Sequence, residues 1–258
     1  MPLQHEFVTF FTPPEWPMCD YKEHDLEMTQ WWQSSLARYL QTQEQQWLQY
    51  RQAKLHGYFQ LQFGGQKLIL PPSIRPAYQA LMGMEGQFHA QIEQLPFKTD
   101  SVDVMLLQHV VEFSRHPHQL LREADRVLSE DGTLILLCFN PFSFWGLRRL
   151  FSWQDKLPWR GQFFSRQRLK DWLALLDFDV IEARSIIYCP PLQNERWIKR
   201  SGFLERWGRR LWPYFGGVTA IVAKKRTILV TPLQSRWQDR KLFPRPQLVT
   251  PSATRKEH

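Results

Sequence analysis

The chain is predicted to be an α/β protein with a mostly parallel sheet and helices on both faces. A buried run, SVDVMLL at 101–107, is followed by an amphipathic helix from Pro117 and then by a second buried run, TLILLCF at 133–139. A strand, a helix of about a dozen residues and a second strand form a βαβ unit, whose strands are parallel. The second run is apolar throughout, as expected for a strand covered on both faces. A chain of 258 residues is long enough for one such domain with additions.

Two segments precede the main domain. Residues 1–24 contain four prolines and no sustained periodicity, which indicates an irregular arm. Residues 25–56 form a predicted helical extension, because Gly and Pro are absent from Asp25 to Lys54. Apolar residues recur there at helical spacing, and the predicted buried face is Trp32, Leu36, Tyr39 or Leu40, Trp47 and Tyr50.

The main domain is placed at 57–226. In its first half, one segment has a clear strand pattern and the others have weak patterns. GYFQLQF at 57–63 alternates apolar and polar residues and stops at Gly64-Gly65, which predicts a strand and a tight turn. The stretch from 66 to 86 is broken by prolines, and no element is predicted in it. QFHAQ at 87–91 is a candidate short strand.

The second half of the domain alternates more clearly. Pro117 suits the first turn of a helix, and Asp131-Gly132 is expected to end that helix with a left-handed residue. Ser165 is expected to cap a further helix. Runs at 178–188 and 218–226 predict two more strands. The apolar stripe of the first helix is Leu120, Leu121, Ala124, Val127 and Leu128.

Composition excludes several classes of protein. The hydrophobic content of 43% is too high for a wholly disordered chain. No apolar run reaches the roughly eighteen residues of a transmembrane helix, and MPLQHEFVTF does not resemble a secretory signal. Cys19, Cys138 and Cys189 form no CxxC pair and indicate thiols in a reducing cytoplasm, the expected location.

The positive charge is regional. The net charge is +8, and nine Lys or Arg against two acids lie between Lys224 and His258. A second basic cluster lies within 196–210, among tryptophans. The region 227–258 is interpreted as a basic, proline-containing tail. Nucleic acid is therefore a candidate partner, through 196–210 and 236–256.

One stretch carries an ordered set of short motifs. They are Glu93, Leu95-Pro96-Phe97, Ser101-Val102-Asp103, Arg126-Val127-Leu128 and Asp131-Gly132. In this order and spacing the chain resembles the type 11 methyltransferase family, within class I S-adenosylmethionine-dependent methyltransferases, and is similar to a proteobacterial methyltransferase-like group. The resemblance implies a Rossmann-like, seven-stranded sheet whose last strand is antiparallel. The runs at 178–188 and 218–226 suit that ending.

The resemblance also implies a cofactor, S-adenosyl-L-methionine, at the carboxyl ends of the strands. Gly64 and Gly65 would lie against its methionine part, and Gln91 beside its adenine. The family has an acid and three glycines where this chain has Phe63-Gly64-Gly65-Gln66, so the glycine motif is degenerate. The implied cofactor-binding set is Gly64, Gly65, Glu85, Gln91, Ile92 and Gln108.

His109 is the candidate general base, because it follows the strand at 101–107 and imidazole titrates near neutral pH. The alternative is a polar residue that simply ends a strand. Glu112 and His116 are weaker candidates. Methyl transfer needs alignment of donor and acceptor and no metal, and no metal site is predicted.

Residues 189–216 form an insertion between the last two strands and are expected to cap the substrate site. Leu204, Trp207 and Leu211 could share one face of a helix opposite three arginines. Three uses fit this pattern: a lid over an apolar substrate, a membrane-surface helix, or an RNA-facing patch. A solvated face over the protein's own core is the fourth.

The leading functional hypothesis is an S-adenosylmethionine-dependent methyltransferase that acts on a small-molecule acceptor. Its rivals are a catalytically silent binding or scaffold protein with this fold, and an RNA-binding or RNA-modifying protein that uses the basic C-terminal flank. The sequence identifies neither the acceptor nor the oligomeric state.

Overall fold

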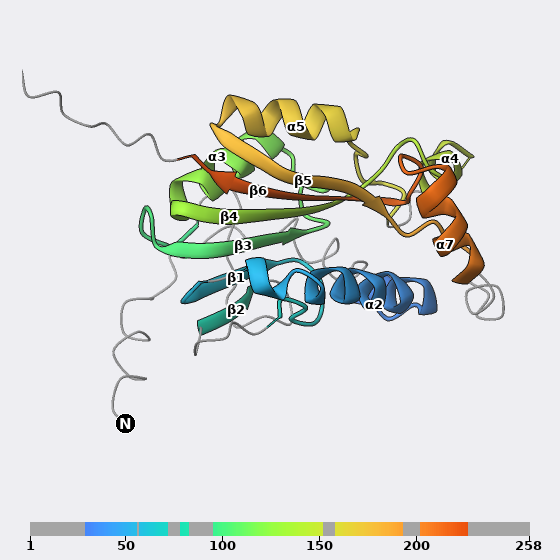
Figure 1. Ribbon diagram of the computed structural model, residues 1–258, viewed down its shortest axis with the longest axis horizontal. Coiled ribbons are helices and arrows are strands. Elements are labelled where there is room, and N and C mark those ends of the chain that lie inside the picture. Colours follow the sequence, from blue (N-terminus) through green and yellow to red (C-terminus); the bar gives the residue numbers. More distant parts are fainter. Residues whose placement is uncertain are drawn as a thin grey trace, which may run out of the picture. The chain divides into compact units, whose positions relative to one another are not determined.

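A six-stranded sheet forms the centre of the protein (Figure 1). The computed structural model describes residues 29–55, 57–71, 78–82, 95–151, 158–192 and 202–226. The strands are β1 (Phe59–Phe63), β2 (Tyr78–Met82), β3 (Val102–Gln108), β4 (Leu128–Phe139), β5 (Phe178–Ile186) and β6 (Val218–Lys225). Their order across the sheet is β2-β1-β3-β4-β6-β5.

The strand directions confirm the predicted α/β class. Strands β2, β1, β3 and β4 are parallel to one another, and β6 is antiparallel to both β4 and β5. The last strand of the chain, β6, is therefore antiparallel to both of its neighbours, as the resemblance implied. Six strands are described where seven were expected, and the candidate strand at 87–91 lies outside the described residues.

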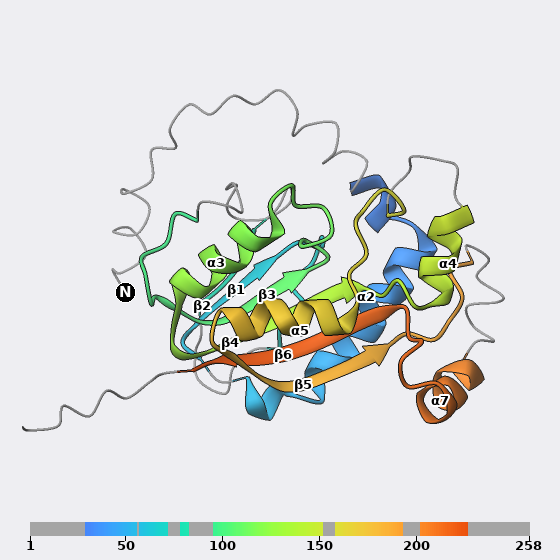
Figure 2. The same ribbon diagram turned by 90° about the horizontal axis from the view of Figure 1, so that it is seen from above.

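Helices cover both faces of the sheet. They are α2 (Ser35–Gln49), α3 (Pro117–Val127), α4 (Phe144–Phe151), α5 (Arg166–Leu175) and α7 (Gly202–Leu211), with a 3-10 turn at Gln52–Lys54. Helices α3 and α5 lie over one face, and α2 lies on the other (Figure 2). Alternate residues of β3 divide accordingly, since Met105 and Leu107 pack on the side of α3, and Val104 and Leu106 on the side of α2.

Helix α2 lies within the segment 25–56, where the sequence predicted a helical extension. The Ser34 hydroxyl accepts a hydrogen bond from the Ala37 N–H at 3.1 Å and caps the helix. Of the predicted face, Trp32, Leu36 and Trp47 are buried, and Leu40 rather than Tyr39 completes it. Tyr50 is 90% exposed, because the helix ends at Gln49 and Tyr50 is only its C-cap residue. The prediction for Tyr50 was wrong.

Helix α3 begins at Pro117 as predicted, and its apolar stripe is buried. Its end was predicted wrongly. The helix stops at Val127, and Leu128 already has extended backbone and starts β4. The left-handed residue is Asp131, at φ 64°, and it lies within β4, where the pairing with β3 is irregular. Asp131-Gly132 therefore belongs to a strand irregularity and not to a helix cap.

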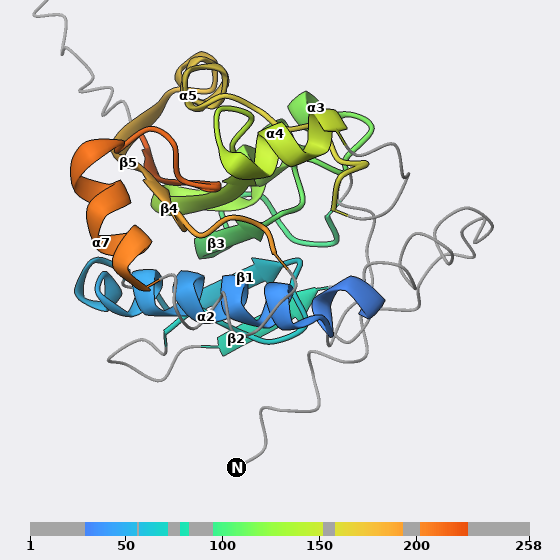
Figure 3. The ribbon, with the colours of Figure 1, turned by 90° about the vertical axis from the view of Figure 1, so that its right-hand side faces the viewer.

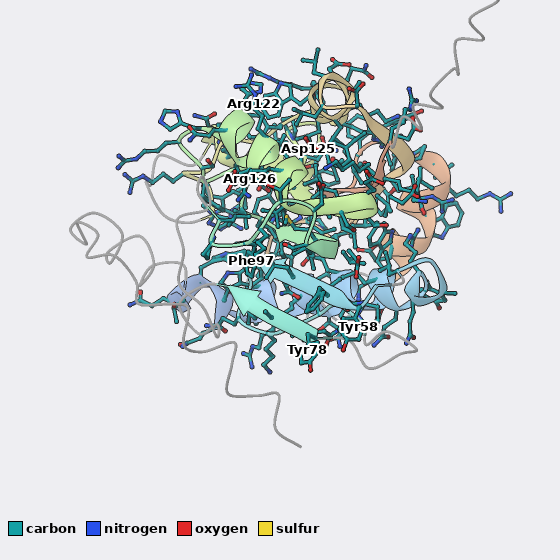
Figure 4. The ribbon with its side chains drawn as sticks, turned by 90° about the vertical axis from the view of Figure 1, so that its left-hand side faces the viewer. Tyr58, Tyr78, Phe97, Arg122, Asp125 and Arg126 are labelled. Carbon is teal, nitrogen blue, oxygen red and sulfur yellow. The ribbon has the colours of Figure 1, made fainter. Side chains whose placement is uncertain are left out.

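Strand β2 was not predicted at all. Its five residues follow a proline-rich stretch, and too few of them alternate to reveal a strand. Parallel strands are usually joined by a helix. In the described part of the connection from β1 to β2, residues 64–71, no helix is present. Figure 4 shows Tyr58 and Tyr78 at this side of the sheet, with ring centroids 5.5 Å apart.

The motifs behind the family resemblance are joined in space. The Arg126 guanidinium donates to the carbonyl oxygens of Leu95 at 3.1 Å and Phe97 at 3.0 Å. The Glu123 carboxylate accepts from the Leu95 N–H at 2.9 Å and pairs with Arg126. Figure 4 shows Arg126 above Phe97. This set of residues therefore fastens the segment before β3 to helix α3 and has a structural role.

Candidate functional site

The turn after β1 packs directly on the end of β3. Gly64 and Gly65 both have positive φ, 79° and 73°, which glycine adopts without strain. A Cβ atom on Gly64 would lie 2.1 Å from the backbone oxygen of Gln108. One on Gly65 would lie 2.1 Å from the Gln108 Oε1 atom. A side chain at Gly64 would meet backbone and one at Gly65 would meet the Gln108 side chain, both at a φ that favours glycine, and the predicted tight turn is present.

Two buried glutamines on neighbouring strands hold this turn. The Gln62 amide nitrogen donates to Gln108 Oε1 at 3.1 Å and to the Lys67 carbonyl at 2.9 Å. The Gln62 side-chain oxygen accepts from the Ile69 N–H at 2.8 Å. A single side chain therefore orders the chain that follows the glycine turn and links it to β3.

A buried charged cluster lies beside the glutamines. Glu44, on α2, accepts from Gln108 Nε2 at 2.7 Å through one oxygen and lies 2.7 Å from His109 Nε2 through the other. His109 Nδ1 lies 3.1 Å from Glu112, whose same oxygen accepts from the Phe139 N–H at 2.6 Å. The side chains of all three ionisable residues are buried. The cluster thus joins α2 to the ends of β3 and β4.

The two carboxylates determine the charge of His109. Burial alone would lower its pKa, but the charge of Glu44 and the hydrogen bonds that the imidazole donates to Glu112 and Glu44 outweigh burial and raise the pKa from 6.5 to about 9. The imidazole is therefore protonated at neutral pH and donates from both nitrogens. Its ring also stacks on Phe139, with centroids 4.1 Å apart.

This geometry argues against the predicted role of His109. A protonated imidazole has no lone pair with which to accept a proton, and both of its nitrogens face carboxylates. His109 is also only 1% exposed. Glu112 is buried in the same cluster, and His116 is exposed at the start of α3. The position of His109 at the end of β3 is as expected, and its environment is that of a structural cation.

The raised pKa of His109 predicts a pH dependence of stability. Because the folded pKa of about 9 exceeds the ordinary 6.5, the stabilisation is complete below pH 6.5 and is lost as the pH rises through 9. We expect the free energy of unfolding to fall by about 3 kcal/mol over this range. Urea denaturation across the range measures it. His116→Asn, at an exposed histidine, should keep the decline, and a flat profile would contradict the assignment.

The other predicted site residues divide into two groups. Gly64, Gly65, Gln108 and His109 meet at the carboxyl ends of β1 and β3. Glu85, Gln91 and Ile92 lie outside the described residues. Among the residues that the structure describes, no cluster of His, Cys, Asp or Glu could hold a metal ion.

Glu44 is the site residue that sequence reasoning missed. It lies on the apolar stripe of α2, one turn after Leu40 and one turn before Leu48, so a charged residue there marks a buried partner. That signal was present in the sequence. What the sequence could not reveal was the partner, because His109 is 65 residues away.

The glycine turn has two backbone N–H groups for which the described residues supply no acceptor. Within the described part of the chain, no group accepts a hydrogen bond from the backbone N–H of Gly65 or Gln66. In the described residues 64–71, however, no helix follows the turn. The N-terminus of such a helix normally adds N–H groups and a partial positive charge for an anionic ligand group. The turn therefore offers fewer donors than a complete glycine loop.

Part of the chain matches a known domain family. Residues 76–136 match the family model described as Methyltransferase domain. This match covers β2, β3 and α3 and begins after the glycine turn.

Two relatives are similar in sequence. The chain is 43% identical over 150 residues to protein YafS of Escherichia coli, an alignment that covers 58% of this chain and 59% of that protein. It is 28% identical over 137 residues to protein MJ1123 of Methanocaldococcus jannaschii, which covers 53% of this chain and 62% of the relative. The chain thus matches less than two thirds of either relative's length.

Solved structures share the fold. A SAM-dependent methyltransferase from Thermotoga maritima superposes with a TM-score of 0.54 at 19% identity, and the match covers 79% of this chain and 98% of that one. Another from Archaeoglobus fulgidus gives 0.51 at 16% identity, over 72% and 94%. Together with the strand order, these likenesses show that the chain has the class I methyltransferase fold, and residues 76–136 match the methyltransferase domain model.

Proposed function

We propose that this protein is an S-adenosylmethionine-dependent methyltransferase that acts on a small-molecule acceptor. One observation carries the proposal: the positive-φ turn Gly64-Gly65 and the ordered Gln108 and His109 meet at the carboxyl ends of β1 and β3. Ligands of doubly wound α/β sheets bind at this edge. The match of residues 76–136 to the methyltransferase domain supports the same reaction class.

The residues present fit the donor in part. The backbone N–H groups of Gly65 and Gln66 suit the carboxylate of a methionine moiety, and Gln91 suits the amino group of adenine. Glu85 and Ile92 complete the proposed contacts. When bound, S-adenosylmethionine would supply an electrophilic methyl group. The protein's own contribution is to hold donor and acceptor in line, which requires an ordered edge and no metal.

The buried cluster supplies that order. Glu44 fixes Gln108 and His109, and Gln62 fixes both Gln108 and residues 67–70. Each of these side chains has its hydrogen-bonding atoms occupied within the protein, so none is free to serve as an acid or a base. We therefore assign them positioning roles and infer that the acceptor supplies its own nucleophile. An amine or another group that is reactive at neutral pH meets this requirement.

Calorimetric titration with S-adenosylhomocysteine tests the proposal. We expect saturable binding, and Gln91→Ala should weaken it by about tenfold because one hydrogen bond to the adenine is lost. Gln119→Ala, at an exposed position on α3, serves as the matched control and should bind as the unmodified chain does. No heat at millimolar ligand, from a chain shown to be folded by its cooperative unfolding, would remove the proposal.

That negative result would favour a catalytically silent binding protein. A specific observation motivates this second candidate: the directions in which Cβ atoms of Gly64 and Gly65 would point are occupied by Gln108. The turn could thus exist for internal packing alone. RNA binding through 196–210 and 236–256 stays a hypothesis from the sequence, since residues 236–256 lie outside the described part.

A further inference from the structure

Large apolar side chains are exposed at one end of the protein, on α4, on α7 and on the segments beside them. Helices α4 and α7 lie beyond the carboxyl ends of β4 and β5 (Figure 1), and both face the viewer in Figure 3. The exposed residues, which we call the α4–α7 face, are Phe142, Phe144, Leu147, Leu150, Phe151, Trp207, Leu211, Trp212, Tyr214 and Phe215. Each is between 49% and 78% exposed.

So many exposed apolar side chains at one end are unusual for a protein surface that faces water. Single exposed apolar residues are normal, but a contiguous patch marks a binding surface. Elsewhere in the described residues, Tyr58, Phe59 and Tyr78 form a smaller exposed aromatic group at the start of β1 and β2, and Leu175 and Ile181 are exposed singly. Most of the exposed large apolar side chains of the described residues belong to the α4–α7 face.

Helix α7 is fixed with its apolar side outward. The Glu205 carboxylate accepts from the Tyr188 N–H at 2.8 Å and from the Tyr39 hydroxyl at 3.1 Å, which turns this acid toward the protein. Gly208 packs on the Tyr188 ring, where a Cβ atom would lie 2.5 Å away. Trp207 and Leu211, one turn apart, are 63% and 53% exposed. The exposure is thus a consequence of how the helix is anchored.

Helix α4 is fixed in the same way. The Trp145 indole N–H donates to the Cys189 carbonyl at 3.0 Å, and Trp145 is 1% exposed. Asn140, before the helix, donates to the Tyr214 carbonyl at 2.7 Å and to the Gly216 carbonyl at 2.9 Å. These bonds tie the start of α4 to the segment after α7, so that the two parts of the face belong to one structure.

The charges on this face have one sign. Residues 141–151 include Arg148 and Arg149 and no acid. In residues 202–216, Arg210 is exposed, and the one acid of that segment is the inward Glu205. Aromatic and aliphatic residues mixed with arginine are the composition of helices that lie in the interface of an anionic bilayer. Among the residues that the structure describes, none of the helices could span a bilayer.

We propose that the α4–α7 face binds the surface of an anionic membrane, with its apolar side chains inserted among the headgroups and its arginines paired with lipid phosphates. This contact is independent of donor binding. It would hold the carboxyl edge of the sheet close to the bilayer, where an apolar acceptor would be concentrated.

Sedimentation with vesicles tests the proposal. The full chain should bind phosphatidylglycerol vesicles and bind phosphatidylcholine vesicles about tenfold more weakly. The double variant Leu150→Ser/Trp207→Ser removes the most exposed side chain of the face and one of its two tryptophans, and should reduce binding by more than about tenfold. Arg210→Glu should reduce it by about tenfold, more so at low salt.

The matched control is Leu175→Ser, which removes an equally exposed leucine from α5. It should bind as the unmodified chain does. Equal loss in this control, or no binding of the full chain to phosphatidylglycerol, would overturn the proposal. A dimer in light scattering that becomes monomeric in the double variant, with no vesicle binding, would also overturn it and assign the face to self-association.

Discussion

Glu44→Ala is expected to lower the free energy of unfolding by about 3 kcal/mol at neutral pH. The substitution leaves the buried imidazolium of His109 with Glu112 as its remaining carboxylate partner and deprives the Gln108 amide of its acceptor at 2.7 Å. It also removes the polar contact between α2 and the end of β3. Urea denaturation followed by circular dichroism measures the loss.

Two further variants show whether charge or packing is responsible. Glu44→Gln keeps the size of the side chain but removes its charge, so the decline of stability between pH 6.5 and 9 should become smaller. Gln45→Ala changes the next residue of the same helix, which is exposed, and should alter stability by less than about 0.5 kcal/mol. If Glu44→Ala were as stable as this control, the cluster would not hold the helix.

Gly64→Ala is expected to destabilise the protein by about 3 kcal/mol. The new Cβ atom would lie 2.1 Å from the Gln108 backbone oxygen and 2.9 Å from the Val110 side chain, at a φ of 79°. This oxygen belongs to the last residue of β3, a central strand, and it cannot shift without disturbing the sheet. The substitution should therefore open the end of β1, and thermal unfolding should report it.

Gly65→Ala tests the same turn with a partner that can be removed. Its Cβ atom would meet the side-chain oxygen of Gln108, so Gln108→Ala in the same chain should relieve the clash. A double-mutant cycle should show a favourable coupling of about 1 kcal/mol. Lys67→Ala, at an exposed position after the turn, is the control. Additive effects of the two substitutions would show that Gly65 and Gln108 do not pack as described.

The sequence predicted the centre of the fold well, for physical reasons. Strand β3, helix α3 and strand β4 are long and strongly patterned, and their burial follows directly from that pattern. Strand β2 escaped prediction because five residues after a proline-rich stretch are too few to show a period. Its place at the edge of the described sheet depends on pairing with β1, which is a tertiary effect.

For the candidate site, the sequence indicated which strand ends lie together but not the protonation state of the side chains there. The strand ends placed Gly64, Gly65, Gln108 and His109 together, as the parallel arrangement requires. The protonation of His109 could not be predicted, since its pKa depends on Glu44 from a helix 65 residues earlier in the chain. A local sequence pattern contains no information about such a partner.

The anchoring of α7 was also beyond local prediction. The expected helix is present, and Gly208, which weakens it, is explained by the Tyr188 ring that it contacts. Helical spacing placed Trp207 and Leu211 on one face but left open whether that face was buried. The face with Trp207 and Leu211 is exposed because Glu205 turns the other side of the helix toward the protein. The partners of Glu205, Tyr39 and Tyr188, lie in two other parts of the chain.

Hydrogen exchange with and without S-adenosylhomocysteine tests the central claim most directly. If the donor binds at the carboxyl edge, peptides that cover residues 59–71 and 102–112 should exchange more slowly with the ligand, because the turn N–H groups gain an acceptor and the cluster opens less often. The exchange rate of peptides that cover α5 should be unchanged. Unaltered exchange in both edge segments at saturating ligand, or protection confined to other parts of the chain, would contradict the account.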